Sequence, residues 1–122
     1  MRGERCTLAR RDTEGIMKES VRSHLIEIYV DPRTGNFTYK PAVYHAKAGK
    51  ETPVSWYTNG DWAVQFTSGT PLETLGIRGH AEKVVDTKVR SDAPRGVYHY
   101  AVAVTIDHDV FLDAGCPTIV ID

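Results

Sequence analysis

The feature that most constrains the fold is the regular alternation of side chains from Val97 to Thr105. Tyr98, Tyr100, Val102 and Val104 share one parity, and Val97, His99, Ala101 and Ala103 share the other. Successive residues of a β-strand point to opposite sides, so a period of two is typical of a strand with one buried face. The segment therefore predicts a long strand that covers a hydrophobic core.

Shorter segments of the same kind recur from residue 24 onward, separated by turn-forming residues. We expect strands at His24–Val30, at Phe37–Ala46 with an interruption at Pro41, around Val54 and Trp56, and at Trp62–Phe66, Val84–Val89, Val97–Thr105 and Ile119–Ile121. The region 67–83 has room for at most a short helix around Leu72–Ile77. Because strands and helices do not alternate, the pattern predicts an all-β fold, an antiparallel or mixed β-sandwich of about seven strands.

Length and organisation indicate one domain. The chain has 122 residues, which is enough for a single self-sufficient core, and it contains no repeat and no Gly/Ser-rich linker. The polar stretch 1–23 carries no convincing helical stripe. We therefore expect an N-terminal extension over 1–23, packed along a β-sandwich domain over 24–122.

Charge and targeting signals exclude several partners. Fifteen Lys and Arg residues against sixteen Asp and Glu residues give a net charge of −1, which argues against nucleic-acid binding. The N-terminal stretch has no apolar run suited to a signal peptide or a membrane span, so a cytoplasmic location without membrane binding is expected. Cys6 and Cys116 show no CxxC spacing and are interpreted as reduced thiols, with a disulfide as the alternative.

Several of these segments, taken in order, resemble the cupredoxins. The matching pieces are Phe37 and Pro41, Gly49, Val54-Ser-Trp56, Asn59-Gly-Asp61, Trp62–Phe66 and Pro94-Arg-Gly96-Val-Tyr98-His-Tyr100-Ala-Val102. The resemblance covers roughly residues 24 to 122 and implies a single Greek-key β-sandwich. An immunoglobulin-like sandwich is the alternative, although the chain lacks the Cys…Trp…Cys pattern of that fold.

The resemblance also implies where a type-1 copper centre would lie, and the chain lacks the ligands. Such a centre needs a thiolate, two imidazoles and usually a thioether. The thiolate position is Val102 and the first histidine position is Trp62, while no methionine follows and Cys116 lies far downstream. We therefore expect core side chains in place of a copper site, and no cofactor.

The densest group of other metal ligands lies near the 107–113 loop. Asp107, His108, Asp109 and Asp113 are close in sequence, and His99 and His45 could join them. A metal site needs three or four converging ligands, and no HxH, HxxxH or HExxH spacing occurs. A solvated hairpin tip is the plainer interpretation, and His99 is also consistent with a partly buried structural histidine.

No catalytic constellation is visible, so we do not expect an enzyme. Cys116 lies in a Gly-Cys-Pro turn without an identifiable base, and no P-loop, dinucleotide fingerprint or nucleophile elbow is present. Among the aromatic residues, Tyr98 resembles a tyrosine corner whose hydroxyl binds a backbone group. Tyr29, Tyr39, Tyr44 and Tyr57 would form a binding patch if exposed together.

The leading functional hypothesis is a non-catalytic protein-interaction or assembly module. Copper-free domains of the fold that the resemblance implies serve in protein recognition. A protein partner or a homo-oligomer is expected, since basic residues gather in the first 22 positions and four aspartates in the last 18. Metal binding near the 107–113 loop is the alternative hypothesis, and a small enzyme with an unfamiliar site is the third.

Overall fold

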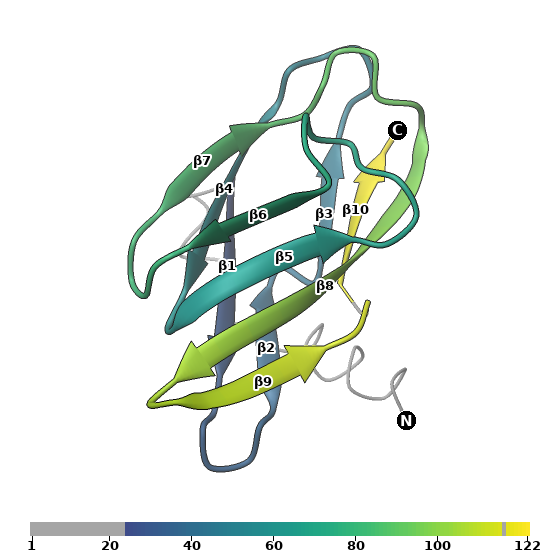
Figure 1. Cartoon of the computed structure of the whole chain (residues 1–122). Helices are drawn as coiled ribbons and strands as arrows, with labels where there is room; N and C mark the ends of the chain where they lie inside the picture. The colour runs from purple at the N-terminus through teal and green to yellow at the C-terminus, as the bar shows by residue number, and fades with distance from the viewer. Residues whose placement is uncertain (1–23, 116) are drawn as a thin grey trace.

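A computed structural model describes residues 24–115 and 117–122 of the chain. These residues form two sheets (Figure 1). The strands are β1 (Leu25–Val30), β2 (Phe37–Lys40), β3 (Val43–Ala46), β4 (Pro53–Thr58), β5 (Asp61–Phe66), β6 (Gly76–Gly79), β7 (Val85–Lys88), β8 (Gly96–Ile106), β9 (Asp109–Asp113) and β10 (Thr118–Ile121). Within the described ranges, no helix is long and apolar enough to cross a membrane. The expected extension over 1–23, with Cys6, and Cys116 lie outside the described residues.

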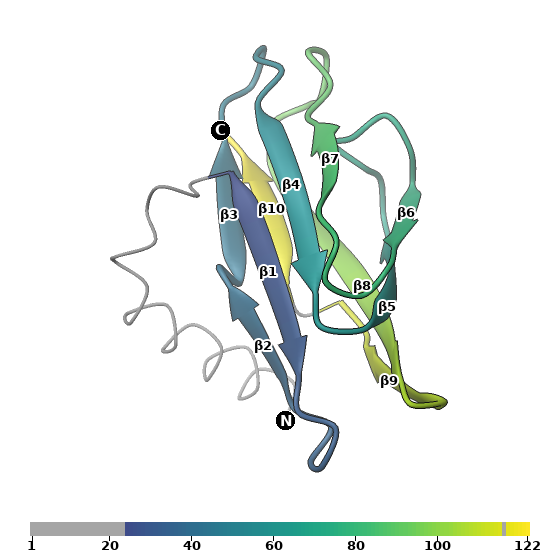
Figure 2. The ribbon, with the colours of Figure 1, turned by 90° about the vertical axis from the view of Figure 1, so that its left-hand side faces the viewer.

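The two sheets are both mixed. The first has the order β2-β1-β4-β7, and the second has the order β3-β10-β8-β5-β6 with β9 paired to β8. β1 runs parallel to β4 and β10 runs parallel to β3, whereas the other pairs are antiparallel. The all-β prediction with mixed sheets is confirmed for the described residues. Figure 2 shows the two layers from the side.

The number of strands differs from the seven expected, for identifiable reasons. Pro41 follows a cis peptide bond and divides the expected strand 37–46 into β2 and β3, which belong to different sheets. The region 67–83, where the sequence left room for at most a short helix around Leu72–Ile77, contains bends followed by β6. β9 lies in the segment that the sequence pattern left as a loop.

A second crossing between the sheets joins β4 to β5 at Asn59 and Gly60. The Asn59 side chain accepts a hydrogen bond from the Val30 N–H at 3.1 Å and donates one to the Val30 carbonyl at 2.9 Å. A Cβ on Gly60 would lie 2.6 Å from the Thr105 carbonyl oxygen. Asn59 therefore anchors the β4–β5 connection to β1 through two hydrogen bonds. Gly60, which has no side chain, allows the same connection to pass close to the β8 backbone.

The core lies between the two sheets, as the alternation predicts. Its largest fully buried side chains include Trp56 and Tyr100, whose rings meet edge to face with centroids 5.2 Å apart. β8 contributes Tyr100, Val102 and Val104, while Tyr98 is partly buried against the same core. The inward parity of β8 is thus confirmed, and the opposite parity faces away from the core.

One edge of β8 is shared by two successive strands. β10 pairs with the beginning of β8 and β9 with its end, on the side away from β5. Val102 of β8 pairs with Asp113 of β9, and His99 of β8 pairs with Thr118 of β10. These pairs are three residues apart along β8 but five residues apart along the chain from β9 to β10. The chain bends at Gly115, two residues after the end of β9, where the φ angle is 92°.

Candidate interaction face

The outer side of β5, β6, β8 and β9 forms a shallow surface with small side chains at its centre. The register places Arg78, Ala63, Ala103 and Leu112 side by side across these four strands. Ala101 lies next to Ala103 along the same face of β8. We call this surface, made of Ala63, Ala101, Ala103, Thr105, Val110 and Leu112, the alanine face.

The large apolar side chains of the alanine face project into solvent beside its three alanines. Val110 is 69 % exposed and Leu112 is 65 % exposed, and both lie on β9. Val97 on β8 and Val43 on β3 belong to the outer side of the same sheet. Of the six large hydrophobic residues that are exposed in the described part of the chain, four therefore lie on this layer. Exposed apolar residues gathered on one face are typical of an interaction surface.

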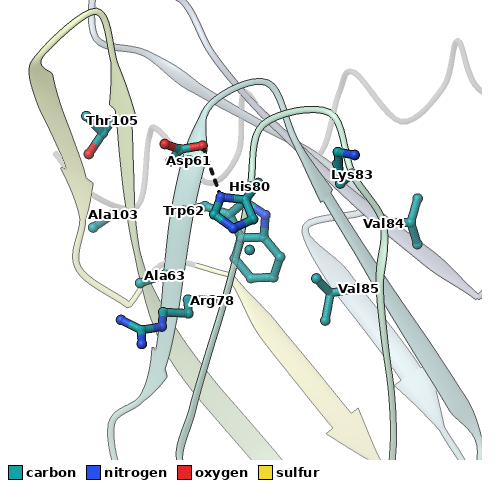
Figure 3. A pocket seen from close by; sticks show the side chains of 11 residues that line it. Asp61, Trp62, Ala63, Arg78, His80, Lys83, Val84, Val85, Ala103 and Thr105 are labelled. Atoms are coloured by element: carbon teal, nitrogen blue, oxygen red, sulfur yellow. Dashed lines mark ion pairs between the residues drawn. The ribbon is translucent and has the colours of Figure 1, made fainter.

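A pocket of about 750 Å³ hollows the end of the alanine face near β6 (Figure 3). Figure 3 shows Ala63, Ala103 and Thr105 on one side, Lys83, Val84 and Val85 on the other, and His80 in front of the Trp62 ring. His80 Nδ1 lies 3.8 Å from Asp61 Oδ1, and both side chains are largely exposed. A second hollow of about 340 Å³, rimmed by Leu112 and Arg78, adjoins it over the alanines. The alanine face therefore has both protruding and recessed parts.

The outer side of the other sheet has a different chemistry. Tyr29 and Tyr57 are half-buried neighbours there with ring centroids 6.0 Å apart, and Lys40 Nζ lies 5.4 Å from the Tyr29 ring centroid. Tyr39 and Tyr44 are buried. The condition for a patch of all four tyrosines is therefore not met, because only Tyr29 and Tyr57 lie together at the surface.

The two positions that the sequence resemblance assigned to copper ligands lie in the hydrophobic core. Val102 is fully buried and Trp62 is 4 % exposed. The Trp62 ring stacks on Trp56 with centroids 6.3 Å apart, and a Cβ on Gly79 would lie 2.6 Å from the indole. The prediction that both side chains belong to the core is confirmed.

The five candidate metal ligands near the 107–113 loop are not brought together. Asp107 and His108 form the tip of the β8–β9 hairpin, and their φ angles of 51° and 74° fit a two-residue turn with both central residues left-handed. Asp109 opens β9 opposite Ile106, and Asp113 is buried at the far end of the same strand. His99 is exposed on β8, so the interpretation as a partly buried histidine is wrong. Among the described residues, no group of three His, Cys, Asp or Glu side chains could hold a metal ion.

Asp113 instead belongs to a buried polar group that the sequence pattern did not indicate. Its Oδ2 accepts a hydrogen bond of 2.6 Å from the Tyr39 hydroxyl, while its Oδ1 has no hydrogen-bond partner. The Tyr100 hydroxyl is also buried without a partner. Burial, together with the nearby Asp113 carboxylate, raises the pKa of Tyr100 well above its ordinary value.

The tyrosine corner at Tyr98 is present. The Tyr98 hydroxyl donates a hydrogen bond of 2.5 Å to the Pro94 carbonyl, four residues upstream. This bond fixes the start of β8, the strand that carries the centre of the alanine face.

No protein-family model matches the chain, and no curated protein matches it significantly.

Proposed function

We propose that this chain is a non-catalytic protein-interaction or assembly module that uses the alanine face. In this proposal, the chain folds as a Greek-key, cupredoxin-like β-sandwich that lacks the type-1 copper ligands. The all-β architecture and the apolar side chains at positions 62 and 102 support this choice.

The observation that carries the proposal is that Val110 and Leu112 are exposed beside the small alanine side chains of the alanine face. Apolar surface removed from water contributes roughly 25 cal/mol per Å². The small alanine side chains let a partner approach the sheet closely. The exposed Val110 and Leu112 side chains on β9 provide apolar surface that the partner can bury. No described strand pairs with the far edge of β9, so the partner can reach this side of the sheet.

Differential capture of partners from the source cells tests the proposal. The bait is the full chain, and the variant is Leu112→Lys, which places a charge in the middle of the apolar edge. Leu75→Lys is the matched control, because Leu75 is 52 % exposed and lies outside the alanine face. We expect at least one partner that the wild type and Leu75→Lys capture equally and that Leu112→Lys loses. Equal capture by all three baits would contradict the proposal.

A further inference from the structure

The pocket of about 750 Å³ beside β6, which we call the β6 pocket, has positively charged side chains in its lining. Arg78 lines it from β6, and Lys83 lines it from the connection between β6 and β7. Among the described residues, no ion pair or hydrogen bond involves either of these side chains. Asp61 Oδ1, also in the lining, accepts a hydrogen bond from the Ala81 N–H at 2.9 Å and lies 3.8 Å from His80 Nδ1. The described part of the chain therefore leaves the two cations of this pocket without a counterion.

The β6 pocket also has apolar walls (Figure 3). Val84 and Val85 lie on one side of it. Ala63 and Ala103 lie on the other side. Sites for small molecules have volumes of about 300–1,000 Å³ and combine apolar walls with a few polar groups that orient the ligand. Apolar walls and unpaired cations together fit a molecule with an apolar body and an anionic group.

A hydrogen-bond donor without a partner lies in the same lining. The Trp62 indole Nε1 is buried, and no described residue accepts a hydrogen bond from it. Gly79 packs directly on the indole, since a Cβ there would lie 2.6 Å from Nε1. The His80 ring lies in front of the indole, and its side chain is 85 % exposed, so it has room to turn aside. Because buried polar groups are nearly always hydrogen-bonded, this N–H is a donor that a ligand oxygen can satisfy.

We propose that the β6 pocket binds a small organic anion, a flat apolar molecule that carries one carboxylate, sulfonate or phosphate group. Arg78 and Lys83 attract the anionic group, and the valine and alanine side chains contact the apolar body. The ring of the ligand displaces His80 from its place over Trp62, and a ligand oxygen accepts a hydrogen bond from the indole N–H. This inference goes beyond the proposed function, because its ligand is a free small molecule and not a protein.

The experiment titrates the full chain, labelled with ¹⁵N, with naphthalene-1-sulfonate and follows the N–H signals by NMR. A ligand of this size should bind with a dissociation constant of about 1 mM or lower. The indole signal of Trp62 should shift in proportion to the bound fraction. The indole signal of Trp56 serves as the internal control and should stay in place, because its Nε1 already donates to Thr87 Oγ1 at 2.9 Å.

Charge variants test the two cations. Arg78→Gln and Lys83→Gln should each weaken the binding of naphthalene-1-sulfonate by roughly threefold or more, because each removes one attractive charge at a largely solvated site. Arg95→Gln and Lys47→Gln are the matched controls, since both residues are exposed and neither lines the pocket. At physiological salt their charges are screened from a ligand in the pocket, and the dissociation constant should not change. Thermal unfolding of each variant verifies that it folds.

A neutral probe tests the need for an anion. Naphthalene-1-sulfonamide has the same ring without the charge and should bind roughly tenfold more weakly, because it loses the attraction of both cations. Equal affinity for the two probes would overturn the assignment of an anionic ligand. An absence of binding, or a titration that leaves the Trp62 indole signal in place, would overturn the site. Equal weakening by Arg78→Gln and Arg95→Gln would show an effect of net charge alone and would also overturn it.

These outcomes are independent of the proposed function. Leu112 does not line the β6 pocket, so capture of a protein partner that Leu112→Lys loses would stand whether or not naphthalene-1-sulfonate binds.

Discussion

The Tyr39 hydroxyl donates a 2.6 Å hydrogen bond to Oδ2 of Asp113 across the interior of the molecule. Tyr39 lies on β2 in one sheet and Asp113 ends β9 in the other, 74 positions later in the chain. The bond therefore ties the two sheets together at the point where the chain bends from β9 towards β10. It also holds the end of the strand that presents Leu112.

Removal of the Tyr39 hydroxyl should destabilise the protein. In Tyr39→Phe, the buried Asp113 carboxylate loses this donor, and hydrogen bonds to charged groups contribute about 1.5–3 kcal/mol. We expect the free energy of unfolding, measured by urea titration, to fall by about that amount. A double-mutant cycle with Asp113→Asn measures the coupling of the two side chains. A Tyr39→Phe variant as stable as the wild type would show that the bond contributes nothing.

Removal of the Tyr100 hydroxyl should have the opposite effect at neutral pH. This hydroxyl is buried without a partner, and an unsatisfied buried polar group costs about 1–3 kcal/mol. We expect Tyr100→Phe to be at least as stable as the wild type, with a melting temperature that is equal or higher. The matched control is Tyr44→Phe, which should be less stable because the Tyr44 hydroxyl donates to the Pro53 carbonyl at 2.9 Å. A marked loss of stability in Tyr100→Phe would indicate that its hydroxyl has a partner.

The raised pKa of Tyr100 also predicts a loss of stability in alkali. Burial keeps this phenol protonated in the folded protein, whereas the unfolded chain releases the proton near pH 10. Above that pH the folded state binds more protons than the unfolded state, so stability falls by up to about 1.4 kcal/mol per pH unit for one such group. We expect Tyr100→Phe to lose less stability than the wild type between pH 9 and 11. Parallel curves for the two proteins would be inconsistent with this origin.

The two glycines at the ends of β6 should differ in their tolerance of a methyl group. A Cβ on Gly79 would lie 2.6 Å from the Trp62 indole, whereas on Gly76 the nearest atom is the flexible Gln65 Oε1 at 2.9 Å. We expect Gly79→Ala to destabilise the protein by about 1–3 kcal/mol and Gly76→Ala to cost less. Chemical denaturation of both variants decides the matter. Equal effects would mean that the indole moves freely away from β6.

The hydroxyl of Tyr98 should contribute to stability through a single hydrogen bond. It donates to the Pro94 carbonyl, and its ring packs beside the core. We expect Tyr98→Phe to lower the free energy of unfolding by about 0.5–1.5 kcal/mol, as measured by urea titration. An unchanged stability would mean that water replaces the hydroxyl without cost.

The strands were predictable where alternation is local and one face is buried. Val97–Thr105 and Trp62–Phe66 have this pattern, and the structure buries the predicted parity of both. Pro41 indicated an interruption of the segment Phe37–Ala46, and at this position the chain passes from β2 in one sheet to β3 in the other. The parallel pairing of β1 with β4 could not be predicted, because it joins segments whose sequences do not indicate a shared register.

β9 and the alanine face were harder to predict for physical reasons. The polar run Asp107-His108-Asp109 suggested a loop. The two-residue tip Asp107-His108, between Ile106 and Asp109, is nevertheless compatible with a tight hairpin. The parity of Ala101 and Ala103 indicated an outward side, but only the fold shows that no described element covers it. Asp113 was considered as a metal ligand because aspartate is usually exposed, and its bond to Tyr39 depends on residues distant in sequence.

Footprinting of side chains with hydroxyl radicals tests most directly whether the alanine face is an interface. The protein is labelled in its associated form and again after dissociation, and modification is measured at Leu112, Val110 and the control residue Leu75. We predict that labelling of Leu112 and Val110 falls on association while that of Leu75 does not change. Equal labelling of Leu112 in both forms would contradict the assignment of this face.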